Sequence, residues 1–187
     1  MKAKTFLIIL IVAISYSLTA QNADFRNVKW GMDSLQVKKV EVAKFVQSKR
    51  NFLVYEGTLG TLDTKIIYNF SLNHKLFNAT YCINSDSKNP QASVNNFLMF
   101  QGLLTQKYKT PYEIKTSTIN GKVISQDEWA FNLISDNLIL ETSWKTMSTK
   151  ITLSLYSLND ELFLEINYSS LDIHSNDGQK ELITKDL

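Results

Sequence analysis

The sequence predicts an α+β fold in which one antiparallel sheet, built from consecutive hairpins, carries two helices on one face. Most of the chain alternates apolar and polar residues in short stretches separated by polar turns, which is typical of antiparallel strands with one face in water. Two other stretches repeat apolar residues at the spacing of a helix that lies on a sheet. The composition of the 187 residues, 44% hydrophobic and 20% charged, is ordinary for one globular domain.

The first twenty residues are typical of a secretory signal peptide. Lys2 and Lys4 precede an apolar run over residues 6–14, and small residues lead up to Ala20. This run is shorter than the roughly 20 residues that span a bilayer, although an uncleaved anchor is the alternative. We therefore expect cleavage near Ala20/Gln21 and a periplasmic or secreted bacterial protein without a transmembrane segment. The expected organisation is a signal peptide over 1–20, one α+β domain over 21–170 and a polar C-terminal tail over 171–187.

Charge and cysteine content exclude several classes of function. Removing Lys2 and Lys4 from the 20 basic residues leaves 18, which balance the 18 acidic ones. A neutral chain lacks the positive surface that binds nucleic acid, so no nucleic-acid partner is expected. Cys82 is the single cysteine, so we expect a half-buried thiol rather than a disulfide or a zinc cluster. His74 and His174 have no second ligand at metal-binding spacing, so no metal and no cofactor is expected.

A capped helix is expected near the start of the domain. Asp33 stands three residues before Gln36, the spacing of a capping box, in which each side chain binds the other residue's backbone N–H. Apolar residues then repeat at helical spacing, and the helix is predicted over residues 33–46. The apolar pattern weakens after Glu41, so an earlier end is also consistent with the sequence.

Alternating strands and a second helix follow. Three strands are predicted next, at residues 51–59, 64–72 and 76–84. The second helix is predicted over residues 91–109, and Pro111 ends it. The remaining alternating stretches are predicted as strands at residues 112–118, 121–125, 128–134, 138–145, 150–157 and 162–168. Within the third of these, Trp129, Phe131 and Leu133 are expected to lie on one face.

Several short motifs resemble small secreted bacterial envelope proteins of uncharacterised function. The stretch Phe25-x-x-Val28-x-Trp30-Gly31-Met32-Asp33-x-x-x-Val37 resembles the W-G-M-(S/D)-x-x-x-V helix start of that group. Leu104-x-x-Lys107-Tyr108-x-x-Pro111 resembles its helix end, although Lys109 stands where glycine is usual. A looser resemblance links the element order to the β-lactamase-inhibitor protein and to the small lipoprotein of the outer-membrane β-barrel assembly machinery. Those are interaction modules, so the resemblance implies a binding role and brings no catalytic residues.

Three tryptophans are the candidate functional residues. Trp30, Trp129 and Trp144 would form an interaction surface if exposed, and would belong to the core if buried. We expect a non-catalytic binding module of the cell envelope, not an enzyme, with an envelope protein, a lipid or a glycan as its partner. The alternative is a small periplasmic hydrolase or lyase that uses carboxylates or tyrosines in a cleft. A purely structural envelope component is a third interpretation.

Overall fold

The structure is a computed structural model of the chain that describes residues 23–118, 121–135, 137–179 and 184. The predicted signal peptide and its cleavage site lie outside the described residues. Within the described part, none of the helices combines the length and the apolar character needed to span a bilayer.

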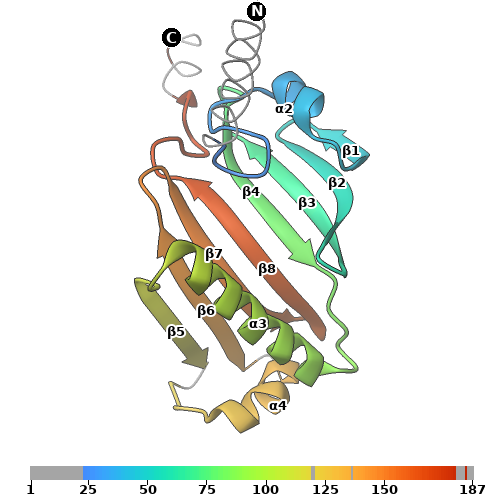
Figure 1. Cartoon of the computed structure of the whole chain (residues 1–187), viewed down its shortest axis with the longest axis vertical. Helices are drawn as coiled ribbons and strands as arrows, with labels where there is room; N and C mark the ends of the chain where they lie inside the picture. Colours follow the sequence, from blue (N-terminus) through green and yellow to red (C-terminus); the bar gives the residue numbers. More distant parts are fainter. Residues whose placement is uncertain (1–22, 119–120, 136, 180–183, 185–187) are drawn as a thin grey trace, which may run out of the picture.

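A single sheet of eight antiparallel strands forms the centre of the molecule (Figure 1). Two meanders of four strands contribute to it. The first consists of β1 (Lys44–Lys49), β2 (Phe52–Leu59), β3 (Leu62–Phe70) and β4 (Leu76–Ile83). The second consists of β5 (Glu113–Thr118), β6 (Leu138–Lys145), β7 (Thr149–Leu158) and β8 (Glu161–Ser170). The strand order is β1-β2-β3-β4-β8-β7-β6-β5, so the last strands of the two meanders pair in the middle of the sheet.

Three α-helices connect and cover these strands: α2 (Ser34–Val40), α3 (Pro90–Tyr108) and α4 (Trp129–Ile134), the last preceded by the short 3-10 helix η1 (Gln126–Glu128). Helix α3 carries the chain from β4 in the centre to β5 at the far edge, and it crosses β6, β7 and β8 on one face (Figure 1). Helix α4 contacts the same three strands near one end of the sheet.

The hydrophobic core lies between α3 and the face of the sheet that it covers. Phe97 and Leu104 of α3 are buried there, as are Ile151, Leu153 and Leu155, which alternate along β7. In the part of the chain that the structure describes, no helix covers the opposite face, and its central side chains are polar. Asn78, Thr80 and Asn167 bind one another there with donor–acceptor distances of 2.9–3.4 Å. The predicted α+β class with one antiparallel sheet is confirmed.

The first helix is shorter than predicted, and an additional strand follows it. The capping box between Asp33 and Gln36 is present, as predicted, but α2 ends at Val40 and residues 44–49 form β1. Glu41 takes an extended conformation at the C-cap, and its carboxylate is buried against Arg26. The prediction of a helix to residue 46 was wrong, and the earlier end that the weak apolar pattern after Glu41 allowed is the one observed.

The region before β6 was also predicted incorrectly. Residues 121–125 form no strand, and Trp129–Ile134 is a helix rather than a strand. Trp129 and Leu133 lie one helical turn apart and face the core, whereas Phe131 is 70% exposed on the other side. The sequence contained a helix signal here, because Ser125 and Glu128 have the spacing of a capping box, and the Glu128 carboxylate accepts from the Ser125 N–H and hydroxyl. The part of the chain that the structure describes therefore has three α-helices, not two.

Candidate functional site

A loop over residues 23–33 crosses the covered face of the sheet beside the C-terminal end of α3. Its position is fixed by side chains at both ends. The Asp24 carboxylate accepts hydrogen bonds from the backbone N–H of Trp30 (2.9 Å) and from the Ser148 hydroxyl (2.7 Å). The Trp30 indole N–H donates to Thr149 Oγ1 at 2.9 Å. This N-terminal loop is thereby attached to the β6–β7 turn, far away in the sequence.

A pocket of about 490 Å³ lies between the N-terminal loop, the end of α3 and the sheet. We call it the loop–helix pocket. It is lined by Ala23, Asp24, Phe25, Arg26, Tyr81, Lys107, Tyr108, Thr146, Ser148, Thr149, Ile151 and Tyr168. Its volume falls within the range of about 300–1,000 Å³ that is usual for small-molecule sites. Apolar rings and convergent polar groups occur together in the lining, as in such sites.

Arg26 enters the pocket from the N-terminal loop and pairs with Glu41. Its Nε and Nη2 atoms donate to the two carboxylate oxygens at 2.9 and 3.0 Å. The Glu41 side chain is completely buried, and it also accepts hydrogen bonds from the Ala43 N–H (2.8 Å) and the Tyr68 hydroxyl. The remaining terminal nitrogen, Nη1, lies 3.5 Å from the Tyr81 hydroxyl, to which it donates.

These contacts keep Glu41 ionised. Burial alone would raise the pKa of this carboxyl, but the hydrogen bonds from Tyr68, Ala43 and Arg26 outweigh burial and lower the pKa. Burial and the adjacent carboxylate raise the pKa of Tyr68, which therefore remains a protonated donor. The backbone of Arg26 has a φ of 49°, a region that costs a residue other than glycine about 1–2 kcal/mol. The two-point ion pair helps to hold that conformation.

An aromatic cluster forms the floor of the pocket. The Phe25 ring lies 4.8 Å from the Tyr81 ring and 5.0 Å from the Tyr168 ring, measured between centroids. Tyr108 on α3 contacts Tyr168 at 6.4 Å. Burial, followed by the neighbouring Tyr108 hydroxyl, raises the pKa of Tyr168. Burial also raises the pKa of Tyr81, although Arg26 opposes this effect. Both phenols are therefore neutral near pH 7 and can donate hydrogen bonds.

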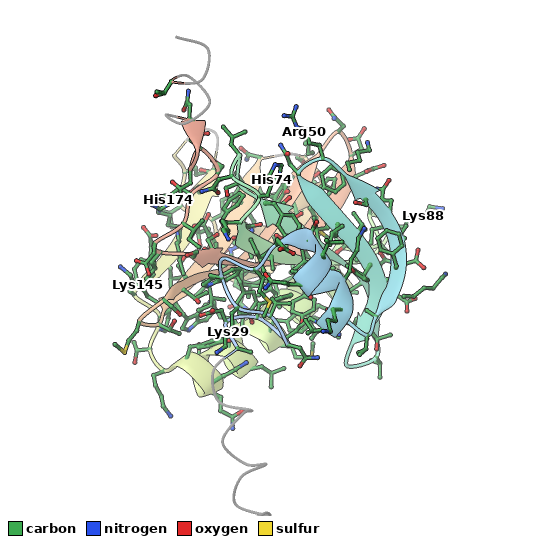
Figure 2. The ribbon with its side chains drawn as sticks, turned by 90° about the horizontal axis from the view of Figure 1, so that it is seen from above. Lys29, Arg50, His74, Lys88, Lys145 and His174 are labelled. Atoms are coloured by element: carbon green, nitrogen blue, oxygen red, sulfur yellow. The ribbon has the colours of Figure 1, made fainter. Side chains whose placement is uncertain are left out.

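Lys107 is the second cation of the pocket. It is exposed, and its ammonium nitrogen lies 5.0 Å from the centre of the Tyr108 ring. Among the described residues it forms no ion pair. Lys107, Arg26 and Tyr81 all line this one pocket. By contrast, Arg50, Lys88 and Lys145 point outward at the rim of the molecule (Figure 2).

The three tryptophans do not form one surface. Trp144 is fully buried in β6, and Trp30 is half-buried with its indole bound to Thr149. Trp129 is half-buried in α4, at the opposite end of the sheet from the N-terminal loop (Figure 1). The indole N–H groups of Trp129 and Trp144 are buried and have no hydrogen-bond partner among the described residues. None of the three lines the pocket, although Trp30 binds Asp24 and Thr149, and Trp144 pairs with Ile151, all of which do.

Cys82 and the two histidines lie outside the pocket. His74 and His174 are exposed in turns, and no cluster of three potential metal ligands occurs among the described residues. Cys82 is half-buried, as predicted, with its sulfur 3.6 Å from a Glu165 carboxylate oxygen. Burial and then the Glu165 charge raise the pKa of the Cys82 thiol to about 12. A thiol with this pKa is a poor nucleophile near pH 7.

Sequence reasoning did not identify the pocket. Lys107 and Tyr108 belong to the helix-end motif, and Arg26 lies within the helix-start motif, so the motifs themselves were the available signal. Nothing in their spacing connects Arg26 with Glu41, or Tyr81 with Tyr168. No protein-family model matches the chain, and no curated protein and no solved structure matches it either.

Proposed function

We propose that this chain is a non-catalytic binding module of the bacterial cell envelope, exported to the periplasm or the medium, and that it binds through the loop–helix pocket. The partner is an envelope protein, a lipid or a glycan that places a group in this pocket. The observation that carries the proposal is the pocket itself, about 490 Å³ in volume and built on the eight-stranded sheet.

The state of the titratable groups supports binding rather than catalysis. The Asp24 carboxylate in the lining accepts hydrogen bonds from Trp30 and Ser148. The Glu41 carboxylate, which pairs with Arg26, accepts from Arg26, Tyr68 and Ala43. The pKa values of Tyr81 and Tyr168 are raised, so these phenols are not bases near pH 7. Neutral phenols and a fixed arginine are instead suited to hold a ligand.

A pocket-blocking variant tests this proposal. Ala23 is exposed and lines the pocket, so Ala23→Trp places an indole at its mouth. Thr61→Trp adds the same ring to the exposed β2–β3 turn and is the matched control. Tagged chains are crosslinked in intact cells of the native host and purified. We expect a partner that accompanies the wild type and Thr61→Trp but is absent with Ala23→Trp. Equal recovery with all three chains would contradict the proposed site.

The alternative is a small hydrolase or lyase that uses the same pocket. The specific observation in its favour is that Asp24 and three tyrosines line one cavity. Such an enzyme would release product from envelope glycans or lipids, and Tyr108→Phe would reduce its turnover without affecting folding. Release of product by the wild type and not by Tyr108→Phe would favour this alternative over a binding module.

A further inference from the structure

We infer that the loop–helix pocket binds a phosphate monoester group, held beside the Tyr81 hydroxyl between Arg26 and Lys107. This inference rests on the proposed function and names the chemistry that the same pocket recognises. The phosphate ester could belong to a soluble sugar phosphate or to the headgroup of an anionic lipid, and the experiment below separates these sources.

Both positive charges lie in the lining of one pocket, together with the Tyr81 hydroxyl. Arg26 Nη1 lies 3.5 Å from that hydroxyl, and Lys107 lines the same pocket with its ammonium 5.0 Å from the centre of the Tyr108 ring. Lys107 has no acidic partner among the described residues, so its charge is available to a ligand. Of the described residues in the lining, Asp24 is the one acid, and its two oxygens already accept from Trp30 and Ser148.

The geometry of the donors favours a tetrahedral anion over a planar carboxylate. A carboxylate is bound best by the two parallel N–H groups of an arginine fork. In Arg26 that fork is occupied by Glu41, which leaves Nη1 as a single donor. Lys107 and Tyr108 of α3, Tyr81 of β4 and Tyr168 of β8 likewise each present one donor atom. Several separate donors suit the three terminal oxygens of a phosphate ester.

The walls of the pocket fit the organic part of such an ester. Phe25, Tyr108 and Tyr168 present rings, and Ile151 adds an aliphatic side chain. The C-terminal end of α3 contributes partial negative charge, which by itself opposes an anion. Lys107 lies in the last turn of that helix and compensates this charge. A control variant must therefore separate direct binding of the phosphate by Lys107 from the general effect of a positive charge at the C-terminal end of α3.

Calorimetric titration of the full-length chain near pH 7.5 tests the inference with three matched sugars. Glucose 6-phosphate carries the tetrahedral anion, glucuronate a planar carboxylate, and glucose no charge. We expect glucose 6-phosphate to bind at least about tenfold more tightly than glucuronate, which is the scale of one charge-assisted hydrogen bond, and glucose not to bind detectably. Vesicles of phosphatidylcholine with and without phosphatidic acid form the lipid arm.

Two charge variants complete the design. Lys107→Gln should weaken binding of glucose 6-phosphate about tenfold. Lys109→Gln removes the same charge from the same helix end, at an exposed residue outside the pocket, and should leave the affinity unchanged. Binding only to vesicles with phosphatidic acid, again weakened by Lys107→Gln alone, would support the inference and identify the source as a lipid.

Each contrary outcome overturns the inference. The first is that glucose or glucuronate binds as tightly as glucose 6-phosphate. The second is that Lys107→Gln and Lys109→Gln lose equal affinity for the phosphate ester. The third is that neither glucose 6-phosphate nor vesicles with phosphatidic acid bind. Binding that Ala23→Trp leaves unchanged would overturn its placement in this pocket. The co-purification experiment with Ala23→Trp and Thr61→Trp tests the proposed function independently of these titrations. A partner lost with Ala23→Trp, without any binding of phosphate esters, would refute this inference and leave the proposed function standing.

Discussion

Glu41 occupies the C-cap of α2, and its buried carboxylate accepts hydrogen bonds from Arg26, Tyr68 and Ala43. A buried charge without partners would cost several kcal/mol, so the fold must bring Arg26 to this position. The same contact joins the N-terminal loop to the end of α2, and Arg26 lines the loop–helix pocket. At the scale of single residues, one ion pair at the end of a helix therefore positions a candidate ligand-binding arginine.

Neutralising this carboxylate should be costly. Glu41→Gln leaves the Arg26 charge without a counter-ion and weakens the bond from Tyr68. We expect the free energy of unfolding in urea to fall by about 3 kcal/mol. Glu56→Gln is the control, because its pair with Lys44 is exposed, with side-chain accessibilities of 48% and 79%. That variant should lose less than about 1 kcal/mol. Equal losses in the two variants would show that the buried pair adds nothing specific.

The same pair predicts how stability depends on pH. The folded pKa of Glu41 is below its ordinary value of 4.5, because hydrogen bonds outweigh burial. Its contribution is complete above that ordinary value and is lost as the pH falls through the folded pKa. The difference in unfolding free energy between wild type and Glu41→Gln should therefore be largest at pH 7 and shrink below pH 4. A difference that stays constant over this range would exclude a role for the charge.

At the scale of elements, the periodicity of apolar residues was sufficient to predict strands in which apolar and polar residues alternate, and to predict a long helix. The strands β2, β4, β6, β7 and β8 and the helix α3 were predicted to within about two residues, because their apolar residues repeat at the period of a strand or of a helix. Periodicity failed for residues 44–49, where all six residues of β1 are exposed at the edge of the sheet. Periodicity also failed at Trp129–Ile134, because a segment of six residues is too short to distinguish the period of a helix from that of a strand.

Two alanine variants distinguish helix from strand at α4. Leu133 is fully buried and Phe131 is 70% exposed, although a strand would place both on one face. Leu133→Ala should lower the free energy of unfolding by about 2–4 kcal/mol, through lost burial and the cavity that remains. Phe131→Ala should change it by no more than about 0.5 kcal/mol. Thermal and urea unfolding of the two variants measure this difference. Similar losses of unfolding free energy in both variants would support a strand at residues 129–134.

At the scale of the whole molecule, the fold consists of two similar halves. Each half is a helix followed by four antiparallel strands, with η1 and α4 inserted between β5 and β6 in the second. The halves meet where β4 pairs with β8, through partners such as Ala79 with Tyr168 and Tyr81 with Ile166. Tyr81 and Tyr168 both line the loop–helix pocket, so the junction of the halves supplies part of its floor. The sequence does not reveal this junction, because the two halves share no residue-level repeat.

Hydrogen exchange can show whether the two halves unfold as one unit. In the eight-stranded sheet, β4 and β8 are paired on both sides, whereas β1 and β5 are edge strands. If the sheet is continuous, the amides of β4 and β8 open only with global unfolding and should be among the slowest to exchange. The amides of β1 and β5 should exchange quickly through local opening, which needs fewer broken contacts. Two independent four-stranded units would instead make β4 and β8 edges, and their amides would then exchange as fast as those of β1 and β5.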